Sequence, residues 1–347
     1  MDEALEHYLS QIHWTWLAGI IVVSLGVLAK AADWLVDEAV ALSERSGIPK
    51  VVIGATIVSL GTTTPEAAVS VFAAIQGSPG LALGNAVGSI ICDTGLILGL
   101  ACLIAPLRLD RAIVNRQGWI QFGSGILLIA ACVPWSSPLS AASTGGNLSQ
   151  LMGFVFLGLL AVYMWQSIRW ARNGQERMRV EEHEGDVGAP LALVVLKLIG
   201  AVALVVLSAQ VLIPAVSESA IRASIPESII AATLVAFGTS LPELITAVTA
   251  ARRGHGELAV GNIVGADILN VLFVSGAAAA ATPAGLDAGV HFFTVLFPVM
   301  MAVLLVFRIG IFMSGESMKR PFGFVLLAAY TVYLAISYLA PGDAASM

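Results

Sequence analysis

Long apolar stretches alternate with short polar ones along most of the chain. A membrane-spanning helix needs about 20 predominantly apolar residues, and ten segments approach or reach that length. In the first half they are 14–36, 51–75, 81–105, 119–133 and 151–168. In the second half they are 191–213, 228–251, 258–281, 292–307 and 322–339. The pattern predicts an all-α integral membrane protein with ten transmembrane helices.

One stretch of the first half recurs in the second half. Residues 54–99 align with residues 231–276 without a gap, and 19 of the 46 aligned pairs are identical. The identities include Gly-Thr-x-x-Pro-Glu, at 61–66 and 238–243, and Gly-Asn-x-x-Gly, at 84–88 and 261–265. We therefore expect two related five-helix halves, 1–168 and 191–347. The hydrophilic stretch 169–190 between them is expected to be a cytoplasmic linker with little fixed structure.

The number of spans in each half determines how the halves are oriented. Because five is odd, two homologous halves of one chain must enter the membrane from opposite sides, as an inverted repeat. Of the 17 Lys and Arg residues, 14 fall in loops on one side and only Arg222 in a loop on the other, while Lys30 and Lys197 lie within spans. Cytoplasmic loops carry the excess of basic residues. We therefore expect a multi-pass protein of the cell (inner) membrane with both termini outside the cytoplasm.

Composition supports the membrane assignment and excludes several kinds of chemistry. Hydrophobic residues make up 58% of the chain and charged residues only 12%, against about 25% charged residues in soluble domains. The three cysteines are scattered in apolar segments, where we expect reduced thiols. The sequence carries no zinc-protease or nucleophile-elbow motif. We therefore expect neither an enzyme nor a resident cofactor.

The duplicated motifs are expected to interrupt their helices near the middle of the membrane. Proline removes a backbone donor, and glycine leaves helical geometry readily. We expect four such breaks, at 61–65, 84–88, 238–242 and 261–265. Irregular backbone at this depth is tolerated only inside the protein or beside a wet cavity. Broken helices at matching places in two halves indicate a transport site.

The polar side chains beside these breaks carry oxygen atoms. Glu66 and Glu243 follow the prolines, and Asp93 and Asn270 come 27 residues after them. Hydroxyl groups precede the prolines at Thr62, Thr63, Thr239 and Ser240. Oxygen atoms without a histidine or cysteine cluster suit hard cations such as Ca²⁺ and Na⁺. Carboxylates that converge at about 4 Å would repel by roughly 4 kcal/mol per pair, so the site must hold cations or protons.

The duplicated segments resemble the alpha repeats of the calcium/cation antiporter superfamily, which includes the sodium/calcium exchangers. The family pattern is G-T-S-x-P-E followed by G-N-x-x-G-S-N, and the resemblance covers both repeats and the ten-span layout. It implies a secondary antiporter that exchanges Ca²⁺ for Na⁺, while some members use H⁺ or also carry K⁺. It also implies Glu66 and Glu243 as central Ca²⁺ ligands, with Asp93 and Asn270 beside them. The implied hydroxyl or carbonyl ligands, shared with flanking Na⁺ sites, are Thr62, Thr63, Ser89, Thr239 and Ser240.

Several positions depart from the family pattern. Ala266 and Asp267 stand where serine and asparagine are usual, and Asp93 with Asn270 reverses the order found in related prokaryotic exchangers. The missing hydroxyl at Ala266 weakens one Na⁺ site, so coupling to Na⁺, H⁺ or K⁺ stays open. Asp267 flanks the last predicted break, and its role is open between an ion ligand and part of an access path.

Alternating access is the mechanism that this layout favours. Ca²⁺ and the coupling ion would compete for one site near the midplane while segments 14–36 and 191–213 move against the other eight. A cation channel could use the same oxygen atoms, but the paired inverted breaks favour an exchanger. A membrane-embedded hydrolase fits least well, because no histidine lies in a break.

Reporter fusions test the predicted orientation. A reporter fused after Met347 or near Gly145 should read outside the cytoplasm, and one near Gly174 should read inside, because 14 of the 15 loop cations lie on one side. The measurement pairs a phosphatase that is active only outside with a fluorescent protein that matures only inside. A cytoplasmic reading at Met347 would overturn the ten-span inverted layout.

Overall fold

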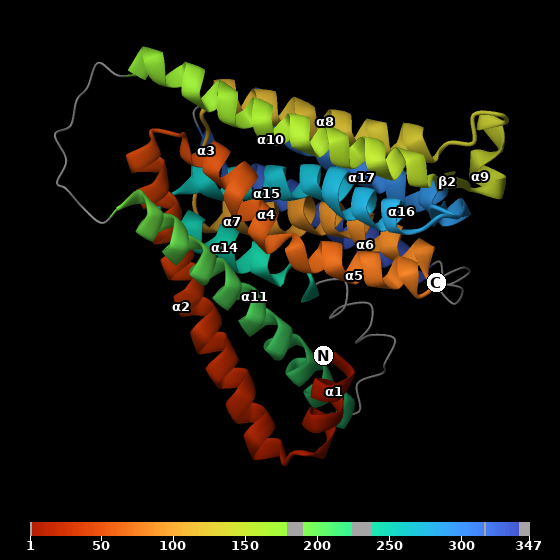
Figure 1. Ribbon diagram of the computed structural model, residues 1–347, viewed down its shortest axis with the longest axis horizontal. Coiled ribbons are helices and arrows are strands. Elements are labelled where there is room, and N and C mark those ends of the chain that lie inside the picture. Colours follow the sequence, from red (N-terminus) through yellow and green to blue (C-terminus); the bar gives the residue numbers. More distant parts are fainter. Residues whose placement is uncertain (1, 179–189, 224–237, 316, 340–347) are drawn as a thin grey trace.

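The computed structural model describes residues 2–178, 190–223, 238–315 and 317–339, and these are almost entirely helical (Figure 1). In this part of the chain, seven helices are long and apolar enough to span a membrane, or eight if one bent pair counts as a span. The expected all-α membrane fold is confirmed at this level. The count of ten stays a prediction, because segment 228–251 lies partly outside the described residues.

The helices of the first half are α1 (Asp2–Gln11), α2 (Trp14–Ser46), α3 (Lys50–Ile53), α4 (Ser59–Thr62), α5 (Thr64–Ile75), α6 (Pro79–Ile91), α7 (Leu98–Ile104), α8 (Arg111–Cys132), α9 (Ala141–Thr144) and α10 (Gln150–Met178). Those of the second half are α11 (Leu191–Arg222), α14 (Leu241–Arg252), α15 (Gly256–Leu269), α16 (Gly276–Ala281), α17 (Phe297–Met313) and α18 (Arg320–Leu339). Four π-helical turns join or extend them: η1 (Gly54–Val58), η2 (Cys92–Ile97), η5 (Asn270–Ser275) and η6 (Phe292–Leu296). The short turn η3 (Pro138–Ser140) precedes α9.

The first Gly-Thr-x-x-Pro-Glu motif breaks its span, as expected. Thr63 lies between α4 and α5, and the two parts of the span meet at an angle of 44°. Pro65 occupies the first turn of α5, where its missing amide hydrogen costs no helical hydrogen bond. In the second half, Thr239 and Ser240 form the turn that leads into α14. Residues 224–237, which precede this motif, lie outside the described part of the chain.

The two breaks expected at 84–88 and 261–265 are wrong. Helices α6 and α15 run through these Gly-Asn-x-x-Gly motifs without interruption. Irregular geometry begins later, in the wide turns η2 and η5, which contain Asp93 and Asn270. Such π-helical turns inside helices occur frequently at functional sites.

In α15, the glycines serve close packing instead of a break. A Cβ atom on Gly261 would lie 2.3 Å from the carbonyl oxygen of Val51, and one on Gly265 would lie 2.4 Å from the Cα of Ala55. On the facing segment of the first half, a Cβ atom on Gly54 would lie 2.7 Å from the carbonyl oxygen of Leu258. Backbones of the first and second halves therefore touch where no side chain fits between them.

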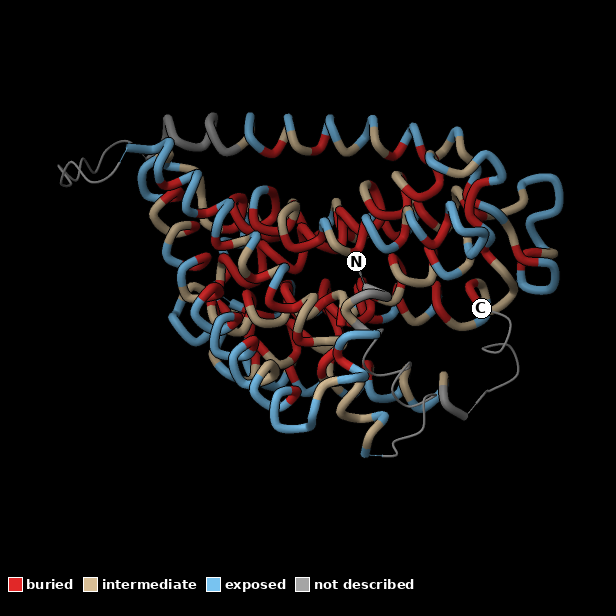
Figure 2. The backbone as a smooth tube through the Cα atoms, turned by 60° about the horizontal axis from the view of Figure 1, so that its bottom comes forward, coloured by how far each residue is buried: buried red, intermediate tan, exposed pale blue. Residues whose placement is uncertain are grey.

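The helices that carry the duplicated segments form the centre of the protein. In the spans Pro79–Ile104 and Gly256–Ala281, 72% and 83% of the most apolar stretch is buried, against 28% in α2 and in α11. Figure 2 shows the buried residues concentrated in the interior and the exposed ones on the outer helices. A helix buried on all sides belongs to the interior, whereas a half-exposed apolar helix of a membrane protein faces lipid.

Helices α2 and α11 make the most extensive contact between any two elements of the described chain. They lean away from the other helices, and their far ends project from the block together with α1 (Figure 1). Arg222, at the end of α11, donates hydrogen bonds to the carbonyl oxygens of Leu9 and Ile12, both at 2.8 Å. These contacts fix α1 to α11, so the three helices form one unit.

Two short antiparallel strand pairs join the halves. Strand β1 (Leu107–Arg108) pairs with β4 (Ser317–Met318), and β2 (Gly146–Leu148) pairs with β3 (Leu286–Ala288). The linker expectation needs one correction: α10 continues to Met178, so the first part of 169–190 is helical because it extends the preceding span. Residues 179–189 lie outside the described chain.

The close backbone contact at Gly265 makes a stability prediction. Gly265→Ala should lower the melting temperature of the purified protein, with a cost of about 1–3 kcal/mol, because the new methyl group overlaps the backbone of Ala55. Gly26→Ala in α2 is the matched control, since a Cβ there meets nothing within 4 Å. Equal melting temperatures for the two variants would show that the halves are not packed this closely.

Candidate cation-binding site

Glu66 and Glu243 occupy equivalent places in the two halves. Each lies in the first turn of a helix, α5 or α14, directly after a proline, and each is only 1% exposed. The amide end of a helix carries partial positive charge and favours a carboxylate. The sequence places both acids there because Pro65 and Pro242 start these helices at the first turn.

The structure brings these two acids together across the halves. The Thr63 hydroxyl donates a 3.1 Å hydrogen bond to Oε1 of Glu243, and Thr62 lies beside the same carboxylate. Glu66 interacts electrostatically with both Glu243 and Asp93. Residues from two distant segments therefore line one place in the interior, as the sequence predicted.

Asp93 and Asn270 lie in the wide turns η2 and η5, and both are 1% exposed. Asp93 interacts electrostatically with Glu243, and Ser240 lies next to it. Both carboxylate oxygens of Asp93 and the amide oxygen of Asn270 have no hydrogen-bond partner. The wide turns thus present oxygen atoms to the interior without satisfying them.

Unpartnered oxygen atoms are the defining feature of this region. Besides Asp93 and Asn270, they include both carboxylate oxygens of Glu66, Oε2 of Glu243, and the hydroxyls of Ser89 and Ser240. Among the described residues, no Lys or Arg forms an ion pair with any of these acids. Buried polar atoms are normally hydrogen-bonded, because an unpaired one costs free energy. A bound hard cation would remove that cost.

The described residues contain no group of three or more acidic, histidine or cysteine side chains arranged to hold a metal ion. In this geometry a cation would be held by at most two carboxylates, with neutral hydroxyl, amide and carbonyl oxygens completing its shell. That mixture is typical of Ca²⁺ and Na⁺ sites and differs from the N/S ligands of zinc.

The remaining threonines contact backbone or amide groups. The Thr62 hydroxyl lies 3.2 Å from the carbonyl oxygen of Val58, and half-buried Thr239 donates to Oδ1 of Asn85 at 3.4 Å. Asn85 also donates from Nδ2 to the Ser70 hydroxyl at 3.0 Å and to the Glu66 carbonyl oxygen at 3.4 Å. Asn85 was not among the predicted site residues, although its duplication in Gly-Asn-x-x-Gly was a signal.

Asp267 lies in a separate hydrogen-bonded cluster at the edge of this region. Its Oδ2 accepts hydrogen bonds from the Thr94 hydroxyl and from Nε2 of Gln121, the second at 2.5 Å. Its Oδ1 has no partner, and the side chain interacts electrostatically with Asp93. The structure therefore places Asp267 near the site, with one oxygen already engaged by α8. Gln121 was not foreseen, because one glutamine in a predicted span carries no distinguishing pattern.

Comparison with known proteins places the chain in a family. Residues 16–169 and 193–339 match the sequence profile described as "Sodium/calcium exchanger protein". The sodium/calcium exchanger MaX1 of Methanosarcina acetivorans is 30% identical, over 92% of this chain and 97% of that protein. The inner membrane protein YrbG of Escherichia coli is 31% identical, over 92% of this chain and 96% of that protein.

The fold agrees with these relatives. A solved structure of the sodium-calcium exchanger NCX_Mj superposes with a TM-score of 0.77 at 25% identity, covering 92% of this chain and 98% of that one. Both matched ranges contain a duplicated segment with its buried acid. The chain therefore belongs to the sodium/calcium exchanger protein family, and it is a multi-pass membrane protein.

Proposed function

We propose that the protein exchanges Ca²⁺ for Na⁺ across the membrane by alternating access, at a site built from the two duplicated segments. One observation carries the proposal: Glu66, Asp93 and Glu243 are buried together with unpartnered oxygen atoms, and no cationic side chain of the described residues pairs with them. Several relatives and solved neighbours are named as sodium/calcium exchangers, which supports these two ions as substrates.

The strand pairs support a ten-span inverted repeat of halves 1–168 and 191–347. β1 follows α7 as β3 follows α16, and β2 precedes α10 as β4 precedes α18. In each pair, the strand after the third span of one half therefore pairs with the strand before the last span of the other half. A two-fold axis in the membrane plane would produce this arrangement. The pairs lie at opposite ends of α8, whose 22 residues span about 33 Å, close to the thickness of a bilayer core.

Charge explains why transport would be exchange and not leak. Moving an unneutralised group of carboxylates past an apolar barrier is costly, so the empty site does not change sides readily. Ca²⁺ or the coupling ions neutralise the same oxygen atoms and release that constraint. The site would therefore cross only when it is loaded with one or the other.

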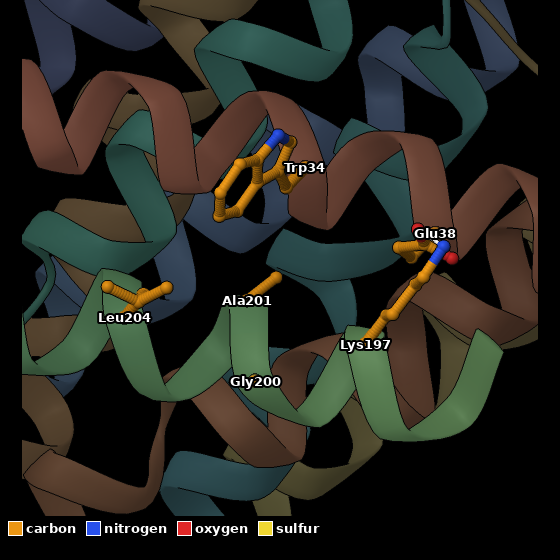
Figure 3. Close-up of a pocket in the computed structure, with 6 residues that line it drawn as sticks. All are labelled: Trp34, Glu38, Lys197, Gly200, Ala201 and Leu204. Atoms are coloured by element: carbon orange, nitrogen blue, oxygen red, sulfur yellow. Dashed lines mark ion pairs between the residues drawn. The ribbon is translucent and has the colours of Figure 1, made fainter. Parts of the chain in front are cut away.

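The pair of helices α2 and α11 fits the role of the moving part. A pocket of about 440 Å³ lies between them. Figure 3 shows Lys197 pointing toward Glu38 at this pocket, and the Lys197 ammonium lies 3.6 Å from the Glu38 carboxylate. This ion pair links the two helices to each other. Both helices are mostly exposed to lipid, whereas the central spans are buried. The pair can thus slide as one unit against a fixed centre.

Coupling to H⁺ or K⁺ is the alternative within the same mechanism. Ala266 offers no hydroxyl, which removes one oxygen from the place where the family pattern supplies serine.

We place the protein in the cell (inner) membrane, with its termini outside the cytoplasm, on the distribution of Lys and Arg.

Transport into vesicles tests the proposal. Proteoliposomes loaded with Na⁺, with K⁺ or with an acidic buffer, each alone, should take up ⁴⁵Ca²⁺ only when the coupling ion can leave, and we expect Na⁺ to drive uptake. Glu66→Gln and Glu243→Gln should each reduce uptake to the level of empty vesicles, because each removes a charge that binds the cation while also removing buried repulsion.

Folding of the two glutamine variants is checked by their melting curves, which should match or exceed that of the unaltered protein. Uptake near the unaltered rate in either variant would place the ion site elsewhere. Ca²⁺ flux that needs no counter-ion would identify a channel.

Asp93 supplies a second prediction. The carboxylates of Glu66, Asp93 and Glu243 carry one negative charge more than one Ca²⁺ neutralises, and a proton on one of these acids would cancel it. We assign that proton to Asp93, because Glu66 and Glu243 lie at helix amide ends that favour the ionised form. Asp93→Asn should therefore retain much of the ⁴⁵Ca²⁺ uptake and weaken its inhibition by acid.

A variant that carries both Asp93→Asn and Asn270→Asp is the matched variant, and it should also transport Ca²⁺. The assignment of the proton is wrong if Asp93→Asn removes Ca²⁺ transport as fully as Glu66→Gln does. In that case Asp93 is an ionised ligand.

A further inference from the structure

An open groove runs between α8 and α10 on the outside of the helix block. Its volume is about 310 Å³, and its lining is chiefly apolar, including Ile120, Gly123, Leu127, Leu159, Val162 and Trp170. Two residues of the lining, Tyr163 and Leu272, are buried. α8 and α10 run along the same side of the helix block in Figure 1, and both contribute residues to the lining.

The groove has the length of one membrane leaflet. On α10 it extends from Leu159 to Trp170, which is about 16 Å of helix at 1.5 Å per residue. A leaflet is half of a hydrocarbon core of about 30 Å. The walls are exposed, with Leu159 38% and Val162 56% accessible. A single extended acyl chain from the surrounding bilayer matches this length and this apolar lining.

An incompletely paired cation lies at the end of the groove. The Arg116 guanidinium stacks over the Trp170 ring, 4.3 Å from its centre. Its Nε has no hydrogen-bond partner, and no ion pair to Arg116 occurs among the described residues. The Asp110 carboxylate interacts with it electrostatically but is already engaged in capping α8, through the amides of Ala112 and Ile113. The terminal nitrogens of Arg116 form no hydrogen bond with the described residues, so they remain available to an external anion.

Apolar groove and cation together identify the occupant. Guanidinium groups bind phosphate through two parallel hydrogen bonds, and an apolar channel excludes a free inorganic ion from most of its length. A zwitterionic phospholipid also offers a phosphate, but its own ammonium group offsets that charge, so an anionic phospholipid compensates the charge of Arg116 more fully. We propose that this groove binds one anionic phospholipid, with an acyl chain between α8 and α10 and the phosphate at Arg116.

The bound lipid would contact the wall of the first broken span. The Tyr163 hydroxyl lies 3.1 Å from the carbonyl oxygen of Ala55 in η1 and 3.2 Å from Oε1 of Gln117. An acyl chain against Tyr163 therefore supports the packing behind that span. The site is independent of the proposed exchange activity, because none of its residues belongs to the cation site.

Native mass spectrometry of the delipidated full-length protein tests the proposal. Phosphatidylglycerol and phosphatidylcholine with identical acyl chains are titrated separately, and the expected result is one tightly bound phosphatidylglycerol per chain. Gly123→Leu should abolish that binding, because a side chain there enters open space and fills the groove. Arg116→Gln should weaken phosphatidylglycerol about tenfold and remove the preference over phosphatidylcholine.

Matched variants separate a specific site from general lipid binding. Gly158→Leu adds the same side chain on exposed α10 outside the groove, and Arg320→Gln removes an exposed cation elsewhere; neither should change binding. Melting curves confirm that each variant is folded. Equal binding of the two lipids to the unaltered protein, unchanged binding in Gly123→Leu, or displacement of the lipid by inorganic phosphate at equal concentration would each overturn the proposal.

Discussion

Burying carboxylates without a paired cation is the constraint on which the rest of this structure depends. Glu66, Asp93 and Glu243 lie in the interior of a membrane protein, and their oxygen atoms have few or no hydrogen-bond partners. In a low-dielectric interior such groups repel each other and lose hydration. Their burial is tolerable when ions or protons occupy the site, which connects the stability of the site to its function.

The backbone around the acids is arranged to hold them without filling the space between them. Prolines begin the helices that carry Glu66 and Glu243, and wide turns contain Asp93 and Asn270. Glycines in α15 allow the backbones of the two halves to meet directly. The central helices thus pack closely on one another, whereas α2 and α11 pack most extensively on each other, and the proposed alternating access would use this difference.

The sequence predicted the parts of the fold that depend on local chemistry. Proline together with glycine located the break before Glu66. Apolar length located one end of each described span within about two residues, but α2, α8, α10 and α11 extend 8 to 10 residues further at the other end. The breaks expected at the Gly-Asn-x-x-Gly motifs were wrong, because a glycine permits a break and a close helix contact equally well. Only the neighbour, such as Ala55 against Gly265, decides between them.

Some features of the candidate site could likewise be predicted from the sequence, and others could not. Duplication and residue type were enough to select Glu66, Glu243 and the threonines, and the structure places Thr63 against Glu243 as a pair across the halves. Tertiary partners could not be predicted. Gln121 reaches Asp267 from α8, and Asn85 connects Thr239 to Ser70, through contacts that no spacing along the chain encodes.

Calorimetric titration of the purified protein with Ca²⁺ tests the central claim most directly, namely that one set of buried oxygen atoms serves both Ca²⁺ and the coupling ion. We predict binding of one Ca²⁺ per chain, with an apparent affinity that falls steadily as the concentration of the coupling ion is raised. Ca²⁺ binding that is independent of Na⁺, K⁺ and H⁺, or that persists after both Glu66 and Glu243 are changed to glutamine, would contradict it.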